Sequence, residues 1–183
     1  AAIIDVLAYP VNVKVFETGS YSTEDIHMTT GADALNEATI LAKKGRRVQL
    51  ETVIGQDDAG KFIQAHCNDA GIMVRDACIK KDEKTGMNIV LVEQDGTRSF
   101  LTNPHGTLRS LKVEHIQMPF PESAKIVCFA SIFVFPKIGP DKLVQIFSQA
   151  KMQGKIVCAD MTKRKKGETL EDMAEAFSYI DYL

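Results

Sequence analysis

The chain contains no tryptophan, no long apolar run and no excess of positive charge. Its 183 residues carry 22 lysines and arginines against 24 aspartates and glutamates, a formal net charge of −2. Nucleic acids and anionic membranes attract concentrated positive charge, so the composition disfavours both as partners. No apolar stretch approaches the roughly 18 residues that a membrane-spanning helix needs. The hydrophobic content of 45% and the length predict an ordinary globular chain of one domain or slightly more.

Cysteine is scarce and shows no metal-binding pattern. Cys67, Cys78, Cys128 and Cys158 form no C-x-x-C pair, and the four histidines share no metal-ligand spacing, so we predict no metal site in this chain. We interpret the cysteines as buried, reduced thiols, which indicates a cytoplasmic protein. We find no signal peptide. The chain starts at Ala1, already within an apolar run, so we expect residues to precede it.

Alternating strand and helix patterns predict an α/β fold. Apolar runs predict strands at residues 2–7, 48–54, 125–130, 155–160 and, as the start of a further strand, 179–183. Periods of 3.6 residues predict helices at residues 33–44, 59–70, 140–153 and 170–178. Such alternation implies βαβ units and therefore a mostly parallel, Rossmann-like sheet flanked by helices.

A second group of strands is too short and too closely spaced for that sheet. We expect short strands at residues 13–16 and 26–30. Residues 87–93 and 98–102 flank an Asp95-Gly96 turn, which is a strong hairpin signal. We expect these strands to form a small separate β layer.

Asp5 interrupts the first apolar strand. A buried carboxylate is costly unless hydrogen bonds satisfy it. One interpretation places Asp5 at the carboxyl end of its strand, where open α/β sheets bind ligands, so that it accepts hydrogen bonds from substrate hydroxyls. The alternative is a strand-end acid capped by backbone N–H groups.

Residues 30–36 and 53–60 contain two glycine-bounded turns. In the first, Gly31 allows close backbone approach, Asp33 is a plausible N-cap, and Asn36 lies on the same side of the expected helix. An asparagine can both donate to and accept from a sugar hydroxyl. The second turn has two acids and no lysine, so we interpret it as structural, with Asp57 or Asp58 capping the next helix.

Two further polar segments could reach a ligand. Asn88, Asn103 and, less directly, His105 lie on or beside the hairpin, as lid residues would, although ordinary exposed loop positions explain them equally well. Residues 160–166 place four cations after an apolar strand. Such a run is usually a solvated loop, but at the ligand edge of a sheet Lys163 or Arg164 could meet phosphate oxygens.

Together, these motifs resemble the ribokinase-like (PfkB) carbohydrate kinases over essentially the whole chain. Residues 30–36 are similar to the family's sugar-binding turn, residues 53–60 to its G-x-D-x-x-G turn, residues 85–98 to its lid, and residues 159–164 to its D-x-x-x-R stretch. Family members transfer the γ-phosphoryl group of ATP, with Mg²⁺, to a primary hydroxyl of a sugar or nucleoside. The resemblance therefore implies ATP and Mg²⁺ as cofactors and a small sugar as substrate.

The resemblance also implies roles for particular residues. Sugar contacts are expected from Asp5, Gly31, Ala32, Asp33 and Asn36, lid contacts from Asn88 and Asn103, and positions nearer the phosphates from Asp160 and Arg164. Residues 1–183 would form a partial ribokinase-like domain, with lid strands at about residues 11–30 and 86–104. The lid would also serve as a homodimer interface, because an exposed β layer offers edges and an apolar face.

The chain departs from the family pattern in two ways. Ala32 stands where the family usually has the second glycine of a pair, and its methyl group would crowd the sugar or shift the backbone. The catalytic G-x-G-D motif and the N-x-x-E motif do not occur. We therefore expect the C-terminal part of the family fold to be absent, no catalytic residue to lie in this chain, and the isolated 183 residues to be inactive.

Two other functions remain as alternatives. One is a sugar-binding or regulatory fragment without catalysis. The other, a dinucleotide enzyme, would need G-x-G-x-x-G after the first strand, whereas residues 8–12 read Ala-Tyr-Pro-Val-Asn. The sequence leaves the substrate open between ribose, fructose, a keto-acid sugar and a nucleoside.

Overall fold

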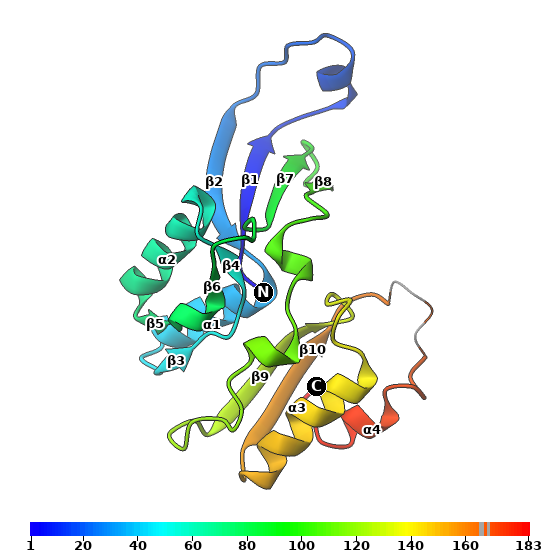
Figure 1. Cartoon of the computed structure of the whole chain (residues 1–183). Helices are drawn as coiled ribbons and strands as arrows, with labels where there is room; N and C mark the ends of the chain where they lie inside the picture. Colours follow the sequence, from blue (N-terminus) through cyan, green and yellow to red (C-terminus); the bar gives the residue numbers. More distant parts are fainter. Residues whose placement is uncertain (165–166, 168) are drawn as a thin grey trace.

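The largest sheet of the computed structural model has the strand order β2-β1-β7-β8 (Figure 1). Its strands are β1 (Ile3–Tyr9), β2 (Asp25–Gly31), β7 (Met87–Val92) and β8 (Arg98–Thr102). Strand β1 runs antiparallel to β2 and parallel to β7, and β7 runs antiparallel to β8. The structure describes residues 1–164, 167 and 169–183, so Lys165 and Lys166 of the predicted cationic loop lie outside the described residues.

The expected hairpin is present and closes at the Asp95-Gly96 turn. Gly96 has φ 87°, a conformation that glycine adopts without strain. The N–H of Glu93 donates to the Thr97 carbonyl over 2.8 Å, and the Asp95 carboxylate accepts from the Thr97 N–H. Local turn chemistry therefore sets the β7–β8 pairing, as the sequence predicted.

The prediction of a separate β layer is wrong in one respect. The first strand, β1, was expected to belong to the other sheet, but it is hydrogen-bonded to both β2 and β7. Residues 13–16 do not form a strand either. They form a short 3₁₀ helix, η1 (Val13–Phe16), because the Asn12 side chain accepts from the Lys14 N–H and turns the chain.

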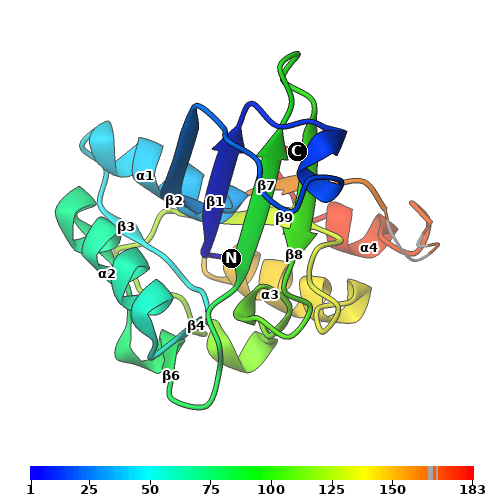
Figure 2. The same ribbon diagram turned by 90° about the horizontal axis from the view of Figure 1, so that it is seen from above.

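Two helices cover one side of this sheet, α1 (Asp33–Lys43) and α2 (Asp58–Ala70) (Figure 2). Leu35 of α1 and Ile63 of α2 pack on Ile4 of β1 in an apolar cluster, and all three side chains are completely buried. Asp57 caps α2, since its carboxylate accepts from the Gly60 N–H, and this confirms the expected cap.

Residues 48–54 do not form the single strand that was predicted. Only β3 (Val48–Gln49) and β4 (Ile54–Gly55) are paired, the first with β5 (Ile72–Met73) and the second with β6 (Ile79–Lys80). Both pairs are parallel. The segment is divided into two strands because its two ends pair with different strands, β5 and β6.

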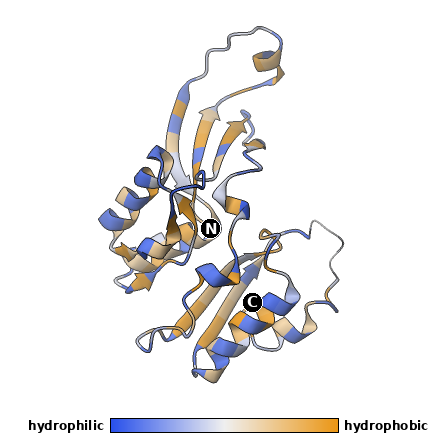
Figure 3. Cartoon of the chain, in the orientation of Figure 1, coloured by the Kyte–Doolittle hydropathy of each residue, from blue (hydrophilic) through white to orange (hydrophobic). Residues whose placement is uncertain are grey.

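A second apolar core lies between the parallel strands β9 (Ile126–Ile132) and β10 (Ile156–Met161) and the helix α3 (Pro140–Met152). Phe129 packs edge-on against Phe135 and Phe147, with ring centroids 5.8 and 5.7 Å apart. Figure 3 shows the hydrophobic residues concentrated along these strands. The α/β class is therefore confirmed, with parallel pairs divided among several small sheets and one mixed sheet.

The prediction that all four cysteines are buried is wrong for the two that lie on the outer face of the β9–β10 pair. Cys67 and Cys78 are buried, but Cys128 is exposed and Cys158 is partly exposed. These two residues are direct partners in the β9–β10 register, and their side chains lie on the face opposite the phenylalanine core. No helix among the described residues is long and apolar enough to cross a membrane.

The last elements are shorter than predicted. Residues 170–178 contain one short helix, α4 (Ala174–Phe177), and residues 179–183 contribute a single parallel bridge, from Tyr182 to Cys158. Apolar contacts explain where the short helix lies, because Met173 and Ala176 are buried in the second core.

A hydrogen bond from Arg75, which also forms an ion pair with Glu51, links the first half of the molecule to the second. Arg75 donates through Nε to Glu51 over 2.9 Å and through Nη2 to the His115 carbonyl over 3.0 Å. Arg75 and Glu51 are both mostly buried. This contact joins the β3–β5 pair to the chain segment that leads into β9.

Candidate functional site

Asp5 and Asn88 form the centre of the candidate site. They are direct partners in the β1–β7 register, and Asn88 Nδ2 donates to Asp5 Oδ1 over 2.9 Å. Asn88 is only 9% exposed, and its Oδ1 atom is buried without a hydrogen-bond partner among the described residues. Because β1 continues to Tyr9, Asp5 lies within the strand and not at its carboxyl end as predicted.

Gly31 makes room for the Asp5 carboxylate. A Cβ atom at position 31 would overlap Asp5 Oδ2. Gly31 is the last residue of β2 and is buried beside β1. The structure therefore brings Asp5, Gly31 and Asn88 together, and it gives a steric reason for glycine at this position.

Ala32 connects β2 to α1 in a strained conformation. Its φ of 77° and ψ of 143° lie in a region that L-residues with a Cβ rarely adopt. Ala32 is the N-cap residue and makes no side-chain cap. Asp33, which was expected to be the cap, is instead the first residue of the helix. Its carboxylate accepts a hydrogen bond from the Ser131 hydroxyl, which explains why it does not cap α1.

Ser131 joins two of the predicted site residues. Its hydroxyl donates to Asp33 and its backbone N–H donates to the Asp160 carboxylate. Its φ of 63° is again in the left-handed region. Sequence reasoning missed Ser131, although it is the first polar residue after the apolar run of β9, where an α/β sheet presents ligand-binding groups.

Glu37 adds a third carboxyl group to this cluster. Burial raises its pKa, and the nearby carboxylates of Asp160 and Asp33 raise it further. Like charges that lie this close favour a protonated carboxyl. The surroundings of Asp160 are therefore acidic, so Asp160 itself is poorly suited to contact a phosphate group.

The remaining predicted residues are exposed. Asn36 lies on the exposed side of α1, one turn after Asp33. Asn103 follows β8, where its Oδ1 accepts from the His105 N–H. Arg164 is exposed on the segment after β10, at the same end of the strand as Asp160.

The Asp57 turn is structural, as predicted. Asp57 accepts from the backbone N–H of Gly60 and from both the N–H and the hydroxyl of Thr85. Thr85 Oγ1 in turn accepts from the Gly55 N–H. A Cβ at Gly55 or Gly60 would overlap neighbouring carbonyl oxygens, so both glycines are required for this close packing.

The chemistry of the site is that of hydrogen-bond acceptors. Asp5 Oδ2, Asn88 Oδ1 and the Asp33 carboxylate suit a ligand that presents several hydroxyl donors, as a sugar does. In the part of the chain that the structure describes, no group of three histidine, cysteine, aspartate or glutamate side chains is arranged to hold a metal ion.

Solved structures with this architecture include several sugar kinases. A fructokinase from Xylella fastidiosa matches with a TM-score of 0.76 and 25% identity, over 98% of this chain and 57% of that one. A sugar kinase from Pyrococcus horikoshii in complex with ATP matches with a TM-score of 0.75 and 19% identity, over 98% and 59%. A fructokinase from Halothermothrix orenii matches with 0.72 and 19%, over 98% and 63%.

This chain therefore spans less than two thirds of the length of each of these solved structures. The family model for pfkB family carbohydrate kinases matches residues 1–183. The predicted resemblance is thus confirmed, and the chain belongs to the pfkB family of carbohydrate kinases.

Proposed function

We propose that this chain supplies the sugar-binding half of an ATP-dependent kinase that phosphorylates a primary hydroxyl of a sugar or related compound. The observation that carries the proposal is the Asp5–Asn88 pair, in which the buried Oδ1 atom of Asn88 has no donor among the described residues. A buried acceptor without a hydrogen bond destabilises the folded state. A sugar hydroxyl is a suitable donor for this acceptor. Asp33 and Asn36 would hold a further part of the same sugar.

ATP and Mg²⁺ are the expected co-substrate and cofactor. The Pyrococcus horikoshii sugar kinase was solved in complex with ATP. In this chain the acidic surroundings of Asp160 disfavour a phosphate, and the nearest described cations that follow it in sequence are Lys163 and Arg164. We propose that the catalytic base and most of the phosphate contacts belong to a part of the kinase outside these 183 residues.

The second candidate function is sugar binding without catalysis. The observation that favours it is the limited coverage, because this chain spans 57% to 63% of the matched kinases. Under either function, we propose a cytoplasmic location, since all four cysteines are free thiols.

Calorimetric titration of the 183-residue chain with ribose, fructose, a keto-acid sugar and a nucleoside tests sugar binding. We expect one class to bind and Asp5→Asn to weaken it at least about tenfold, because a hydrogen bond to a charged group is worth roughly 1.5–3 kcal/mol. Asn68→Ala, on the exposed side of α2, is the matched control and should bind as the unaltered chain does. Failure to bind any of the four classes would contradict the proposed site.

Turnover tests where the catalytic groups lie, because both candidate functions predict none from the isolated chain. We expect no ATP-dependent phosphorylation of the bound sugar by the isolated chain, even with Mg²⁺ present. Measured turnover would show that the catalytic groups lie within these 183 residues, and would refute their assignment elsewhere. An intact-mass measurement comes first, because a mass near 20.2 kDa is needed to show that the sample contains only this chain.

A further inference from the structure

A row of polar side chains crosses the face of the large sheet that carries Asp5. Thr29, Asp5, Asn88 and Thr102 are successive register partners on β2, β1, β7 and β8. Direct partners in a sheet project to the same face, so the four side chains lie side by side. Thr102 is exposed and Thr29 is partly exposed. The row therefore offers a ligand hydroxyl, amide and carboxylate groups, but no cation.

The next row on the same face is mainly apolar. His27, Leu7, Val90 and Phe100 are again successive register partners, each two residues along its strand from the polar row. The only titratable member, His27, is already paired with Asp25, whose carboxylate oxygen lies 2.6 Å from Nδ1. This row therefore adds no positive charge that is free to pair with a ligand.

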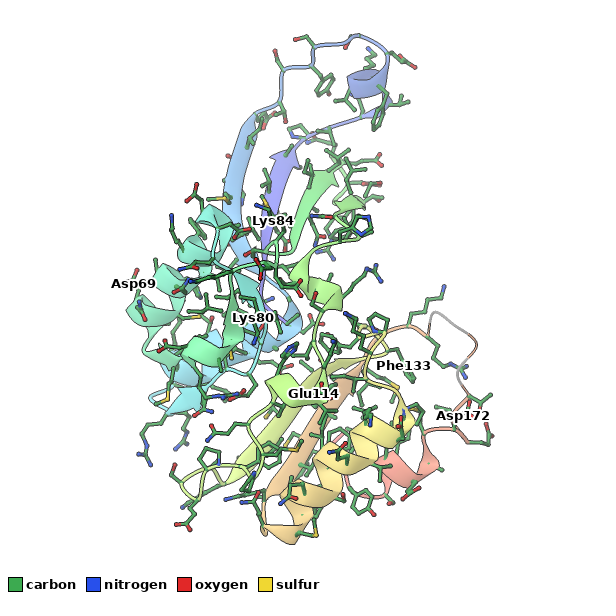
Figure 4. The ribbon with its side chains drawn as sticks, viewed as in Figure 1. Asp69, Lys80, Lys84, Glu114, Phe133 and Asp172 are labelled. Carbon is green, nitrogen blue, oxygen red and sulfur yellow. The ribbon has the colours of Figure 1, made fainter. Side chains whose placement is uncertain are left out.

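The cations nearest to these rows do not lie on the polar row. Arg98 is the one lysine or arginine in the four strands of the sheet, and it is four residues along β8 from Thr102, roughly 13 Å in an extended strand. Its guanidinium carbon lies over the Phe100 ring, 6.0 Å from the centroid. Lys84, labelled in Figure 4, is exposed on the segment that precedes β7.

Carboxyl groups gather where the site meets α1. Asp33 begins this helix two residues after Gly31, and Glu37 follows one turn later. Ser131 links Asp33 to Asp160, and the pKa of Glu37 is raised by burial and by these two acids. The N-terminus of a helix by itself attracts an anion, but Asp33 already places a carboxylate in the first turn. A second anion there would meet like charge.

We propose that the site selects a neutral sugar and excludes sugar acids, an inference that rests on the sugar-binding function proposed above. A sugar hydroxyl can donate to Asp5 and accept from Thr102, whereas a carboxylate can only accept. The carboxylate would also lose hydration beside Asp5 and Asp33 without a cation to pair with it. Of the four substrate classes that the sequence left open, this excludes the keto-acid sugar.

Two sugars that differ only at C1 test the proposal. 2-Keto-D-gluconate is D-fructose with a carboxylate in place of the C1 hydroxymethyl group. The 183-residue chain is titrated calorimetrically with both, and with ribose and adenosine as further neutral ligands. We expect a neutral ligand to bind, and 2-keto-D-gluconate to bind at least about tenfold more weakly than the best of them, because its charge is repelled.

The outcomes separate this inference from the proposed function. Binding of 2-keto-D-gluconate within about tenfold of the best neutral ligand would overturn the inference and leave sugar binding established. Absence of binding by all four compounds would contradict both.

A variant of the polar row tests whether charge sets the preference. Thr102→Arg places a guanidinium beside Asn88, so the preference for the neutral ligand over 2-keto-D-gluconate should fall at least about tenfold. Ser99→Arg adds the same cation to the opposite face of β8, at an exposed position, and should leave the preference unchanged. An unchanged preference in a folded Thr102→Arg chain would refute the inference.

Ionic strength gives a second measurement that needs no variant. Raising it from about 0.01 M to about 1 M shortens the Debye length from about 30 Å to about 3 Å. Screening should raise the affinity for 2-keto-D-gluconate relative to the neutral ligand. A ratio of affinities that does not depend on salt would also refute the inference.

Discussion

Ala32 shows that the backbone at the start of α1 is under strain. A residue with a Cβ in its conformation costs about 1–3 kcal/mol relative to an unstrained one. Glycine adopts the same angles without this cost, but loses more conformational freedom on folding. Ser131, which holds Asp33 across the site, has a positive φ as well. The strain therefore lies on both sides of the Asp33–Ser131 hydrogen bond, where the candidate site is built.

We predict that Ala32→Gly raises the free energy of unfolding by about 1 kcal/mol. Urea denaturation measures the change. Ala42→Gly, in the last turn of α1, is the control and should lower the free energy of unfolding by up to about 1 kcal/mol, because glycine has poor helix propensity. A loss of stability in Ala32→Gly as large as in the control would contradict the inferred strain.

The pKa of Asp57 predicts that the stability of the folded chain depends on pH. Burial raises the pKa of its carboxyl group, but the hydrogen bonds from Thr85 and Gly60 outweigh burial, and the pKa lies below its ordinary value. An acid with a lowered pKa in the folded state stabilises the fold above its unfolded-state pKa of about 3.9. This contribution is lost as the pH falls through the folded-state pKa.

Asp57→Asn should therefore lower the free energy of unfolding by about 2 kcal/mol at pH 7, the worth of a hydrogen bond to a charged group. The difference from the unaltered chain should shrink as the pH falls below 4, which denaturant titrations over that range would show. Asp58→Asn is the control, because the Asp58 side chain is 98% exposed and its ion pair with Lys61 contributes little. A pH-independent difference for Asp57→Asn would contradict the assigned cause.

At the scale of elements, the sequence correctly predicted strands and helices whose position is set by a single turn or helix cap. The β7–β8 hairpin follows from Asp95-Gly96, and the start of α2 follows from Asp57. The predictions for residues 13–16 and 48–54 failed for two different reasons. Asn12 caps a turn that apolar alternation does not reveal, and the two ends of residues 48–54 pair with different strands.

The close contact between β1 and β2 at Gly31 makes a further prediction. Gly31→Ala places a Cβ on the Asp5 carboxylate, which should move Asp5 away from Asn88 and reduce sugar binding at least tenfold. The double variant Gly31→Ala, Asp5→Ala removes the overlap, so it should recover stability without recovering binding. Calorimetric titration and thermal unfolding measure the two effects. Normal sugar binding by a folded Gly31→Ala chain would contradict the assigned role of Asp5.

At the scale of the whole molecule, the large sheet leaves an apolar row uncovered. Met28, Val6, Ile89 and Leu101 are successive neighbours across β2, β1, β7 and β8. Met28, Ile89 and Leu101 are 45%, 45% and 54% exposed, whereas Val6 packs against the apolar cluster of α1 and α2. Contiguous apolar surface of this kind is typical of an interface. We propose that a second copy of the chain covers it, as expected for a lid that also serves as a dimer interface.

Sedimentation velocity tests this interface. We predict a dimer for the unaltered chain at micromolar concentration and a monomer for the double variant Ile89→Lys, Leu101→Lys, because burying two unpaired charges is strongly unfavourable. Ile40→Lys, at an exposed apolar position of α1 outside the row, should remain a dimer. A monomeric unaltered chain would refute the proposed dimer.

The sequence by itself determined the alternation of strands and helices, the hairpin, the family and the acceptor chemistry of Asp5. These depend on periodicity, turn residues and motifs, which are local. Only the tertiary structure decided that Asp5 meets Asn88, 83 residues away, and that Asp33 binds Ser131, 98 residues away, instead of capping α1. Such contacts depend on strand register and on the packing of distant segments, and neither is encoded in the residues nearby.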